Sequence, residues 1–365
     1  MLMYQKISYI FSICFICFCS CSSREKHTAS PSDLQSELDQ IVLNTEVEIT
    51  GLLYHRFGEA KYPSTSISRG LFKEQLAFLE SNNFEVVTLS EAVDKLTSAD
   101  EKGKFVIITI DDAFKSFINN GFPLLQEFGF KATLFINTET VGSGDYLDWE
   151  ELKFLVDNGI EIGNHTHSHA YFLDIDPADR YQVFSEEVKK AQAIIEEKLH
   201  IKPVVFAYPY GEYDLEMKHV IRDMGFVCAA AQNSGVISGY SDLYALPRFP
   251  MTDLYGKMPV FKEKIAMKAL PVIKTIPELT IAEQNPPVLE IILDDIEIEY
   301  RQMQCFIQGG DCEIIYPDSN IFSYRITSDR SLTARHHLYT ITVPDKENRN
   351  WYWFSFQWIF PDKKE

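Results

Sequence analysis

Apolar and polar positions repeat along the chain in units of one kind from Thr45 onwards. Each unit has a segment with helical spacing of apolar residues, a Gly or Asn that ends the helix, and a short apolar strand. Four such pairs are 71–81 with 84–87, 123–128 with 130–136, 149–158 with 160–162, and 214–224 with 226–230. Asp148 and Glu151 have the spacing of a capping box before the third helix. This alternation predicts a parallel α/β structure, either a barrel or a doubly wound sheet, and we favour the barrel.

A strongly apolar strand, 105–110, ends in Asp111 and Asp112. Five of the seven residues from Phe105 to Asp111 are apolar and most are β-branched, which is typical of a parallel strand buried on both faces. Open α/β sheets and α/β barrels carry their functional groups at the carboxyl ends of such strands. Because neighbouring side chains point in different directions, one carboxylate could hold a metal while the other accepts a proton. An Asp-Asp turn or a helix N-cap is the alternative interpretation.

The pattern changes after residue 258. Five prolines within 259–287 predict a linker, and short strands with turn signals predict a small antiparallel β-sandwich over 288–365. The predicted strands are 289–293, 297–306, 313–316, 322–326, 337–343 and 351–360. Alternate residues from Tyr352 to Phe360 form the core face of the last strand, so Trp351 and Trp353 fall on the other face. There they could stack on sugar rings or pack on the preceding domain, and we favour packing.

The composition is that of a globular protein with an acidic surface. The 365 residues suffice for one large and one small domain, and 45% of them are apolar and 24% charged. A formal net charge of −19 leaves no basic stripe to neutralise phosphates, which argues against nucleic acid as a partner. Such a surface would tolerate a cationic polymer. We expect a monomer.

The first residues have the pattern of an export signal. Lys6 precedes an apolar run, 7–18, that is too short to span a bilayer. The stretch 18–23 resembles a bacterial lipobox with Cys21 as the lipidated residue, which makes 1–21 a lipoprotein signal peptide and 22–44 a tether. We therefore expect an exported protein, periplasmic or on the cell surface, held by Cys21 to the membrane, in a Gram-negative host the outer membrane. A signal peptide that is cleaved conventionally, or not cleaved, is the alternative.

Three of the seven cysteines lie beyond the leader. Cys228 falls in an apolar strand and is expected to be a core thiol. Cys305 and Cys312 could pair across a hairpin in an oxidising compartment, but only one of two turn registers places them opposite each other, so both states stay open. No Cys-x-x-Cys pair exists after the leader, which argues against a thiolate zinc site.

Three histidines follow the strand 160–162 directly, at 165, 167 and 169. His165 and His169 have the H-x-x-x-H spacing of metal ligands, and neutral imidazole is a common ligand of divalent transition metals. A zincin would need Glu at the second position, where Thr166 stands. A surface histidine run without function is the alternative. The apolar stretch 204–206 leads into a tight turn, 207–211, whose amides could face the same site.

Three separated motifs resemble those of the NodB-type polysaccharide deacetylases, and the resemblance covers roughly 49–250. They are Thr109-Ile110-Asp111-Asp112, His165-Thr166-His167-Ser168-His169 and Phe206-Ala207-Tyr208-Pro209-Tyr210-Gly211. The resemblance implies a distorted (β/α)-barrel and a divalent metal, zinc in the first place, with nickel, cobalt or iron as options. It implies that Asp112, His165 and His169 hold the metal, that Asp111 is the general base, and that the Tyr210 amide helps to bind the oxyanion. His167 is expected not to be a ligand.

This sequence departs from the family pattern at two points. Ala207 stands where the third motif begins with an Arg that orients the base, and Arg248 is expected to supply that charge. The usual late Leu-x-His is missing, but Leu52-Leu53-Tyr54-His55 resembles the early Tyr-His motif of the branch acting on poly-β-1,6-N-acetylglucosamine. His55 would then protonate the leaving amine, and a buried structural histidine is the alternative.

The resemblance implies an enzyme, a metal-dependent polysaccharide N-deacetylase in residues 45–258, acting on an acetylated, N-acetylglucosamine-containing glycan of biofilm or cell wall. Two alternatives remain at this point. One is a catalytically inactive barrel that binds glycan, against which the intact Asp111, Asp112, His165 and His169 argue. The other is the same hydrolase chemistry on peptidoglycan, chitin-like oligomers or acetylated xylan.

Overall fold

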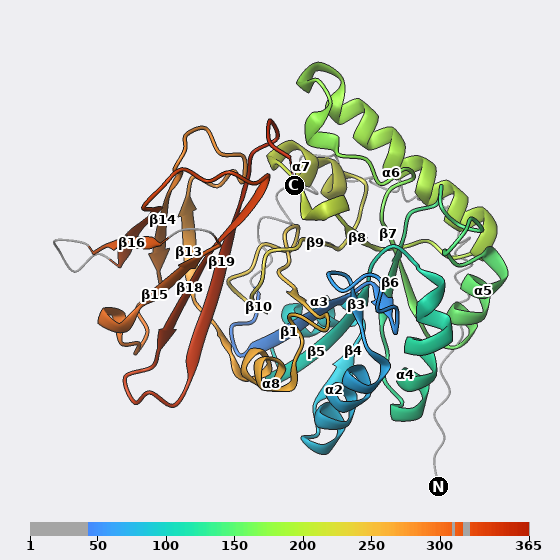
Figure 1. The fold of residues 1–365 in the computed structure, drawn as a ribbon, viewed down its shortest axis with the longest axis horizontal. Coiled ribbons are helices and arrows are strands. Elements are labelled where there is room, and N and C mark those ends of the chain that lie inside the picture. The colour runs from blue at the N-terminus through green and yellow to red at the C-terminus, as the bar shows by residue number, and fades with distance from the viewer. Residues whose placement is uncertain (1–42, 309–310, 317–321, 365) are drawn as a thin grey trace, which may run out of the picture. The chain divides into compact units, whose positions relative to one another are not determined.

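The computed structural model of the protein describes residues 43–308, 311–316 and 322–364. The expected signal peptide, Cys21 and nearly all of the tether lie outside these residues. In the described part of the chain, no helix combines the length and the apolar character needed to cross a membrane. Residues 42–365 form one compact unit. Within it, a curled parallel sheet with helices (the barrel part, 43–266) is followed by a two-sheet sandwich (267–364) (Figure 1).

The barrel part alternates strands and helices, as the sequence predicts. Its strands are β1 (Val47–Tyr54), β2 (Arg56–Phe57), β3 (Ser66–Ile67), β4 (Glu85–Val87), β5 (Gly103–Ile110), β6 (Thr133–Ile136), β7 (Glu161–Asn164), β8 (Val205–Ala207), β9 (Cys228–Ala230), β10 (Val236–Ser238) and β11 (Phe249–Pro250). Its α-helices are α2 (Arg69–Ser81), α3 (Leu89–Thr97), α4 (Phe122–Phe128), α5 (Trp149–Asp157), α6 (Pro177–Leu199), α7 (Leu215–Asp223) and α8 (Met258–Ala266).

The main sheet has the order β10-β1-β5-β6-β7-β8-β9, with β4 beside β5 and β11 beside β1. All of these pairs are parallel except β1 with β10. The predicted distorted barrel is confirmed as a curled half-barrel. Residues 246–250 connect its two sides, since Leu246 bridges to Ala230 of β9 while Phe249 and Pro250 pair with β1. Arg248 lies between these two bridges.

Local signals in the sequence set the ends of several helices. The capping box predicted at α5 is present, with the Asp148 side chain accepting from the Glu151 amide at 2.8 Å and the Glu151 side chain accepting from the Asp148 amide at 2.9 Å. Gly129 ends α4 in the left-handed region at φ 66°, which glycine adopts without steric cost. The long helix α6 was not among the predicted elements.

The sandwich begins earlier than the sequence suggests. Its sheets have the orders β12-β19-β18-β15 and β13-β14-β17-β16. The strands are β12 (Lys268–Ala269), β13 (Val272–Ile276), β14 (Val288–Leu293), β15 (Gln304–Ile307), β16 (Cys312–Ile315), β17 (Ser323–Ser328), β18 (His336–Pro344) and β19 (Trp351–Ile359). The region expected as a linker, 259–287, therefore differs from that expectation. It holds most of α8 as well as β12 and β13, which pair with β19 and β14 because a proline-rich segment can still supply edge strands.

Cys305 and Cys312 form a disulfide with their Cα atoms 5.6 Å apart. The disulfide is one of the two outcomes that the sequence left open. The two cysteines do not, however, face each other across a hairpin. Cys305 lies on β15 and Cys312 on β16, which belong to different sheets. The bond therefore links the two layers of the sandwich. Cys228 is a buried free thiol, as predicted.

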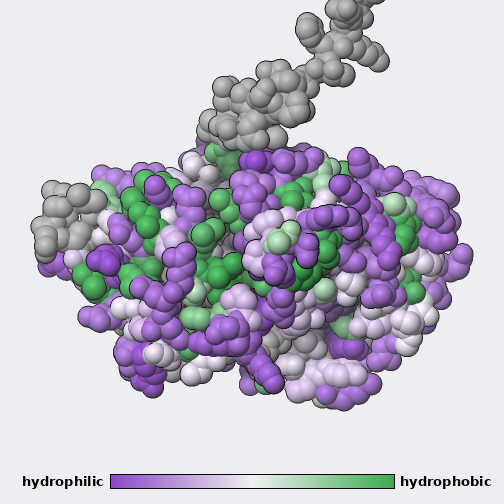
Figure 2. Space-filling view, turned by 90° about the horizontal axis from the view of Figure 1, so that it is seen from above, coloured by the Kyte–Doolittle hydropathy of each residue, from purple (hydrophilic) through white to green (hydrophobic). Residues whose placement is uncertain are grey.

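The last strand, β19, divides its faces as the alternation predicts. Phe356, Trp358 and Phe360 lie in the sandwich core. On the other face, Trp353 packs edge-on against Phe249 of the barrel part with ring centroids 5.4 Å apart. Packing rather than exposed stacking is thus confirmed for Trp353, which contacts the neighbouring domain. Figure 2 shows one face of the molecule, where hydrophilic residues predominate and hydrophobic ones gather in separate patches.

Candidate active site

The carboxyl ends of β1 and β5 bring three of the predicted residues to one edge of the sheet. Tyr54 pairs in parallel register with Ile110, and the amide of Asp111 donates to the Tyr54 carbonyl at 2.9 Å. His55 follows Tyr54 directly, so continuation of this register places His55 beside Asp111. A positive charge on His55 would lower the pKa of both Asp111 and Asp112, which shows how close the imidazole is to the two carboxyls.

Asp112, His165 and His169 converge on one point. Their candidate ligand atoms all lie within 4.8 Å of one another. The two imidazole Nε2 atoms are 3.1 Å apart, and Asp112 Oδ1 is 3.6 Å from the His165 Nε2 and 3.4 Å from the His169 Nε2. Metal–ligand bonds of about 2.0–2.2 Å in tetrahedral geometry place ligand atoms about 3.3–3.6 Å apart. The three atoms are therefore spaced like ligands of a single cation.

The surroundings of this triad fit a divalent cation. Asp112 Oδ1 is buried and has no hydrogen-bond partner among the described residues. His165 Nδ1 lies 2.7 Å from the Ala207 carbonyl, which assigns the N–H to that nitrogen and leaves the Nε2 lone pair facing Asp112. Burial lowers the pKa of His165 to about 3, and burial also lowers that of His169, so both rings are neutral. Two neutral imidazoles and one carboxylate form a donor set that suits zinc, iron, cobalt or nickel.

The pKa of Asp112 is raised to about 6, chiefly by burial, although a charge on His55 acts in the opposite direction. Among the residues that the structure describes, no Arg or Lys forms an ion pair with Asp112 like the one between Arg248 and Asp111. A metal ion held by the triad would supply the missing positive charge.

The backbone of the site is held in unfavourable conformations. Five of the non-glycine residues with positive φ in the described chain fall in the three site loops: Asp112 at 71°, Ala113 at 56°, Thr166 at 67°, His169 at 55° and Tyr210 at 57°. Each such conformation costs on the order of 1–3 kcal/mol and persists only where the surrounding structure imposes it. This concentration of strain is typical of a functional site.

Asp111 is the partner of Arg248. The guanidinium donates to both carboxylate oxygens, at 2.7 Å to Oδ1 and 2.9 Å to Oδ2, and both side chains are fully buried. Arg248 also donates to Thr109 Oγ1 and to the Ala231 carbonyl, at 3.1 and 2.9 Å. Burial alone would raise the pKa of Asp111, but the charge and hydrogen bonds of Arg248, with help from the nearby histidines, lower it to about 2. Arg248 thus contacts the carboxylate that Ala207 cannot reach.

The other predicted residues lie where the motifs suggested. Tyr210 stacks edge-on against the His169 ring, with centroids 4.5 Å apart, in the turn Pro209–Gly211. His167 turns away from the triad, because its Nδ1 lies 2.8 Å from Thr138 Oγ1.

The sequence did not single out Arg335, Glu212 and Tyr171, which support the same wall of the site. Arg335, from the sandwich, donates to both oxygens of buried Glu212, at 2.5 and 2.9 Å. Its guanidinium also lies 4.7 Å from the Tyr171 ring centroid, and Tyr171 stacks on Tyr210 at 3.6 Å. The sequence hints at this network only through Glu212, a charged residue directly after the third motif. Its partner Arg335 is more than a hundred residues away in the chain, so no local pattern connects the two.

Comparison with known proteins agrees with this geometry. The model of the polysaccharide deacetylase family matches residues 98–229, which include both aspartates and the triad histidines. Fold, candidate site and family match agree with one another, and all three are similar to those of the polysaccharide deacetylases. The resemblance noted from the motifs is therefore confirmed.

Three proteins illustrate how similar the relatives are. The chain is 25% identical over 209 residues to the poly-β-1,6-N-acetyl-D-glucosamine N-deacetylase of Staphylococcus epidermidis, covering 52% of this chain and 70% of the relative. The structure of IcaB from Ammonifex degensii is 26% identical with a TM-score of 0.54, covering 60% of this chain and 99% of that chain. The Streptococcus pyogenes deacetylase PplD, solved in complex with acetate, shares the fold at 21% identity and a TM-score of 0.56, covering 60% and 99%.

The Asp111–Arg248 pair predicts a pH-dependent contribution to stability. The folded pKa of about 2 lies below the unfolded value, so the pair stabilises the fold above about pH 4 and loses this effect as the pH falls towards 2. Arg248→Met leaves a buried charge unpaired and should cost roughly 3–5 kcal/mol near pH 7. Urea unfolding at several pH values should show the difference from wild type shrinking in acid.

Arg180→Met is the matched control, since it breaks another largely buried Arg–Asp contact, with Asp214 at 3.2 Å. It should lower stability but keep activity per folded molecule, whereas Arg248→Met should lose both. A stability difference for Arg248→Met that is constant from pH 7 to pH 3 would contradict the assignment.

Proposed function

We propose that this protein is a metal-dependent deacetylase that removes N-acetyl groups from an N-acetylglucosamine-containing polysaccharide. The observation that carries the proposal is the division between the two adjacent aspartates. Arg248 holds Asp111 through both carboxylate oxygens, while Asp112 turns an unpartnered oxygen towards two neutral imidazoles. One carboxylate is thereby kept for proton chemistry and the other for a cation.

The triad Asp112, His165 and His169 would hold the cation. When bound, a divalent metal activates water and polarises the acetyl carbonyl as a Lewis acid. Asp111 accepts the proton of the attacking water as general base. Its low pKa, about 2, keeps it ionised near neutral pH.

Two further residues complete the reaction. The backbone amide of Tyr210, held at φ 57° beside His169, donates to the oxyanion that develops on the acetyl carbonyl. His55, at the end of β1, donates a proton to the nitrogen of the sugar as the C–N bond breaks. Acetate and a free amine are the products.

Two observations support a particular substrate class. The S. epidermidis relative is named for poly-β-1,6-N-acetyl-D-glucosamine, and the chain has the early Tyr54-His55 pair in place of a late histidine. We therefore propose this polymer, a biofilm glycan, as the first to test. Acidic surface charge is compatible with a product that gains positive charge at each deacetylated unit.

Acetate release and metal content together test the division of labour. Asp112→Ala, His165→Ala and His169→Ala should each lose bound metal and activity, because three ligands leave no spare. Asp111→Asn should keep its metal while turnover falls by roughly 10² to 10⁴-fold, the usual contribution of a general base. Wild-type protein should stop releasing acetate when a chelator is added.

The assay should include poly-β-1,6-N-acetylglucosamine, peptidoglycan, chitin oligomers and acetylated xylan. Metal loss of equal size in all four variants would contradict separate roles for the two aspartates. Bound metal without acetate release from any polymer would favour a glycan-binding protein.

His55→Ala tests the proton donor. The variant should keep fold and metal affinity but lose most turnover on N-acetyl substrates, because an amine leaves poorly without a proton. An aryl acetate has a good leaving group and should be hydrolysed nearly as fast as by wild type. Equal impairment on both substrates would mean that His55 is structural.

We further propose that the protein is exported and anchored through lipidated Cys21, on the strength of the lipobox-like stretch alone. Cys21→Ser should abolish labelling by palmitate and release the protein from membranes, whereas Cys19→Ser should remain labelled. A Cys21→Ser protein that still carries label would rule out this anchor.

A further inference from the structure

Arg335, which directly precedes β18 of the sandwich, contacts two separate loops of the barrel part. In the loop after β7, Asp174 lies 2.8 Å from the guanidinium, and the Tyr171 ring centroid lies 4.7 Å from it. In the segment after the third motif, Glu212 accepts hydrogen bonds from Arg335 through both carboxylate oxygens. Arg335 and Glu212 are both buried, so water screens their contact little, whereas Asp174 is half-exposed and contributes less.

Each of these two loops carries a group that the proposed reaction needs. The loop after β7 holds His169, one of the three candidate metal ligands. The other loop holds the turn Pro209–Gly211 with the Tyr210 amide, directly before Glu212. The relative position of the two loops therefore sets where this amide lies with respect to the triad.

Aromatic packing connects the two loops beside the triad. The Tyr171 and Tyr210 rings lie face to face, with centroids 3.6 Å apart and planes 6° from parallel. Tyr210 in turn packs edge-on against His169 at 4.5 Å. The Arg335 guanidinium is attracted to the Tyr171 ring by the negative potential of the aromatic face. Guanidinium, two phenol rings and imidazole thus form one continuous series of contacts.

The turn that carries the amide depends on such contacts. Tyr210 has φ 57° and ψ 7°, a left-handed conformation that a tyrosine keeps only where its surroundings impose it. Gly211 is left-handed too, at φ 69°, and a Cβ there would lie 2.7 Å from the Gln232 amide nitrogen. Gln232 therefore packs against the Gly211 backbone, while the Tyr171 ring packs against the Tyr210 side chain.

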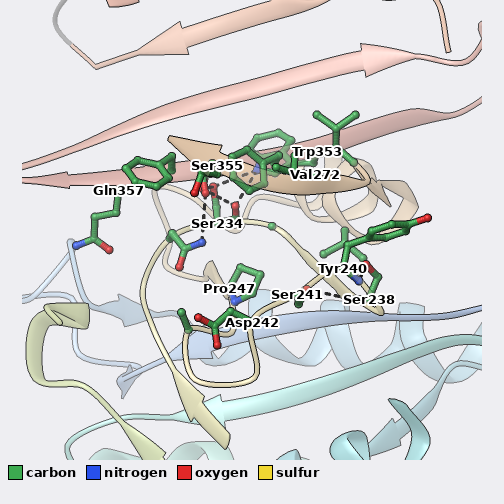
Figure 3. Close-up of a pocket in the computed structure, with 18 of the residues that line it drawn as sticks. Ser234, Ser238, Tyr240, Ser241, Asp242, Pro247, Val272, Trp353, Ser355 and Gln357 are labelled. Atoms are coloured by element: carbon green, nitrogen blue, oxygen red, sulfur yellow. Dashed lines mark hydrogen bonds between the residues drawn. The ribbon is translucent and has the colours of Figure 1, made fainter. Parts of the chain in front are cut away.

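Other contacts hold the sandwich against the barrel part around Ser234 (Figure 3). The Ser234 carbonyl accepts from the Ser355 hydroxyl and, at 3.1 Å, from the Trp353 Nε1. Ser355 and Trp353 lie on β19, which pairs with β18 along its length. Ser355 thus belongs to the same interface as Arg335 but is hydrogen-bonded to a different segment, which makes it a suitable control.

We infer that Arg335 is a positioning residue of the active site, which links the loop of His169 to the turn of Tyr210 and so fixes the amide that binds the oxyanion. Arg335 acts through Glu212 and Tyr171. The role of the amide rests on the proposed function, whereas the link between the two loops rests on the contacts alone. Because an oxyanion donor acts at about 2.7–3.1 Å from the developing charge, displacement of the turn slows the chemical step rather than substrate binding.

Acetate release from polymer and hydrolysis of an aryl acetate by Arg335→Met and Tyr171→Leu test this role. In both variants kcat should fall roughly 10- to 100-fold on both substrates, with KM and bound metal little changed, because a displaced donor slows every acyl transfer. His55→Ala, by contrast, should spare the aryl acetate. Tyr171→Leu leaves no buried charge unpaired, so it tests the role even if Arg335→Met does not fold. Ser355→Ala is the matched control and should keep the wild-type kcat.

Hydrogen–deuterium exchange of the full protein, followed by mass spectrometry, gives a readout that needs no activity. Peptides covering 170–175 and 208–213 should exchange about tenfold faster in Arg335→Met and Tyr171→Leu than in wild type, because local opening of both loops becomes easier. In Ser355→Ala the same peptides should exchange at the wild-type rate.

Wild-type kcat in the folded Arg335→Met and Tyr171→Leu variants, unchanged exchange of both peptides, or an equal loss in Ser355→Ala would overturn the positioning role. Acetate release by wild type in that case would leave the proposed function intact. Faster exchange in the two variants without acetate release by wild type would instead remove the deacetylase function and keep the link between the two loops.

Discussion

The site depends on one buried ion pair, Asp111 with Arg248. Two charges removed from water lose several kcal/mol of hydration each, and good geometry with further hydrogen bonds must offset that loss. The bidentate contact and the bonds from Arg248 to Thr109 and Ala231 meet that condition. Arg248 reaches Asp111 only because residues 246–250 connect β9 with β1. The segment that closes the half-barrel therefore also supplies the charge that keeps Asp111 ionised.

The same pair explains how two neighbouring carboxyls acquire opposite properties. Arg248 lowers the pKa of Asp111 to about 2, whereas burial raises that of Asp112 to about 6. The left-handed backbone of Asp112 turns its side chain out of the direction in which the strand would carry it. Strain in one residue thus separates two groups that sequence places side by side.

Local rules in the sequence predicted much of this structure. Gly129 and the Asp148–Glu151 box mark helix ends because they act on the backbone within a turn, and the spacing of His165 and His169 follows from one short loop. The start of the sandwich, the helix α6 and the sheets joined by the disulfide were missed, because pairing across long separations leaves no periodic trace. Arg248 was predicted because the family pattern requires an arginine that Ala207 replaces in this sequence. No family pattern pointed to Glu212 and Arg335.

Because Arg335 belongs to the sandwich, one wall of the candidate active site cannot form before this part of the chain has been synthesised. Glu212 directly follows the third motif, and burial raises its pKa until hydrogen bonds from Arg335 and His336 lower it below the usual value. Until residue 335 has been synthesised, this carboxylate lacks its partner and the Tyr171–Tyr210 stack lacks its guanidinium cover. The wall beside His169 can therefore be completed only after the chain has been synthesised into the sandwich as far as the start of β18.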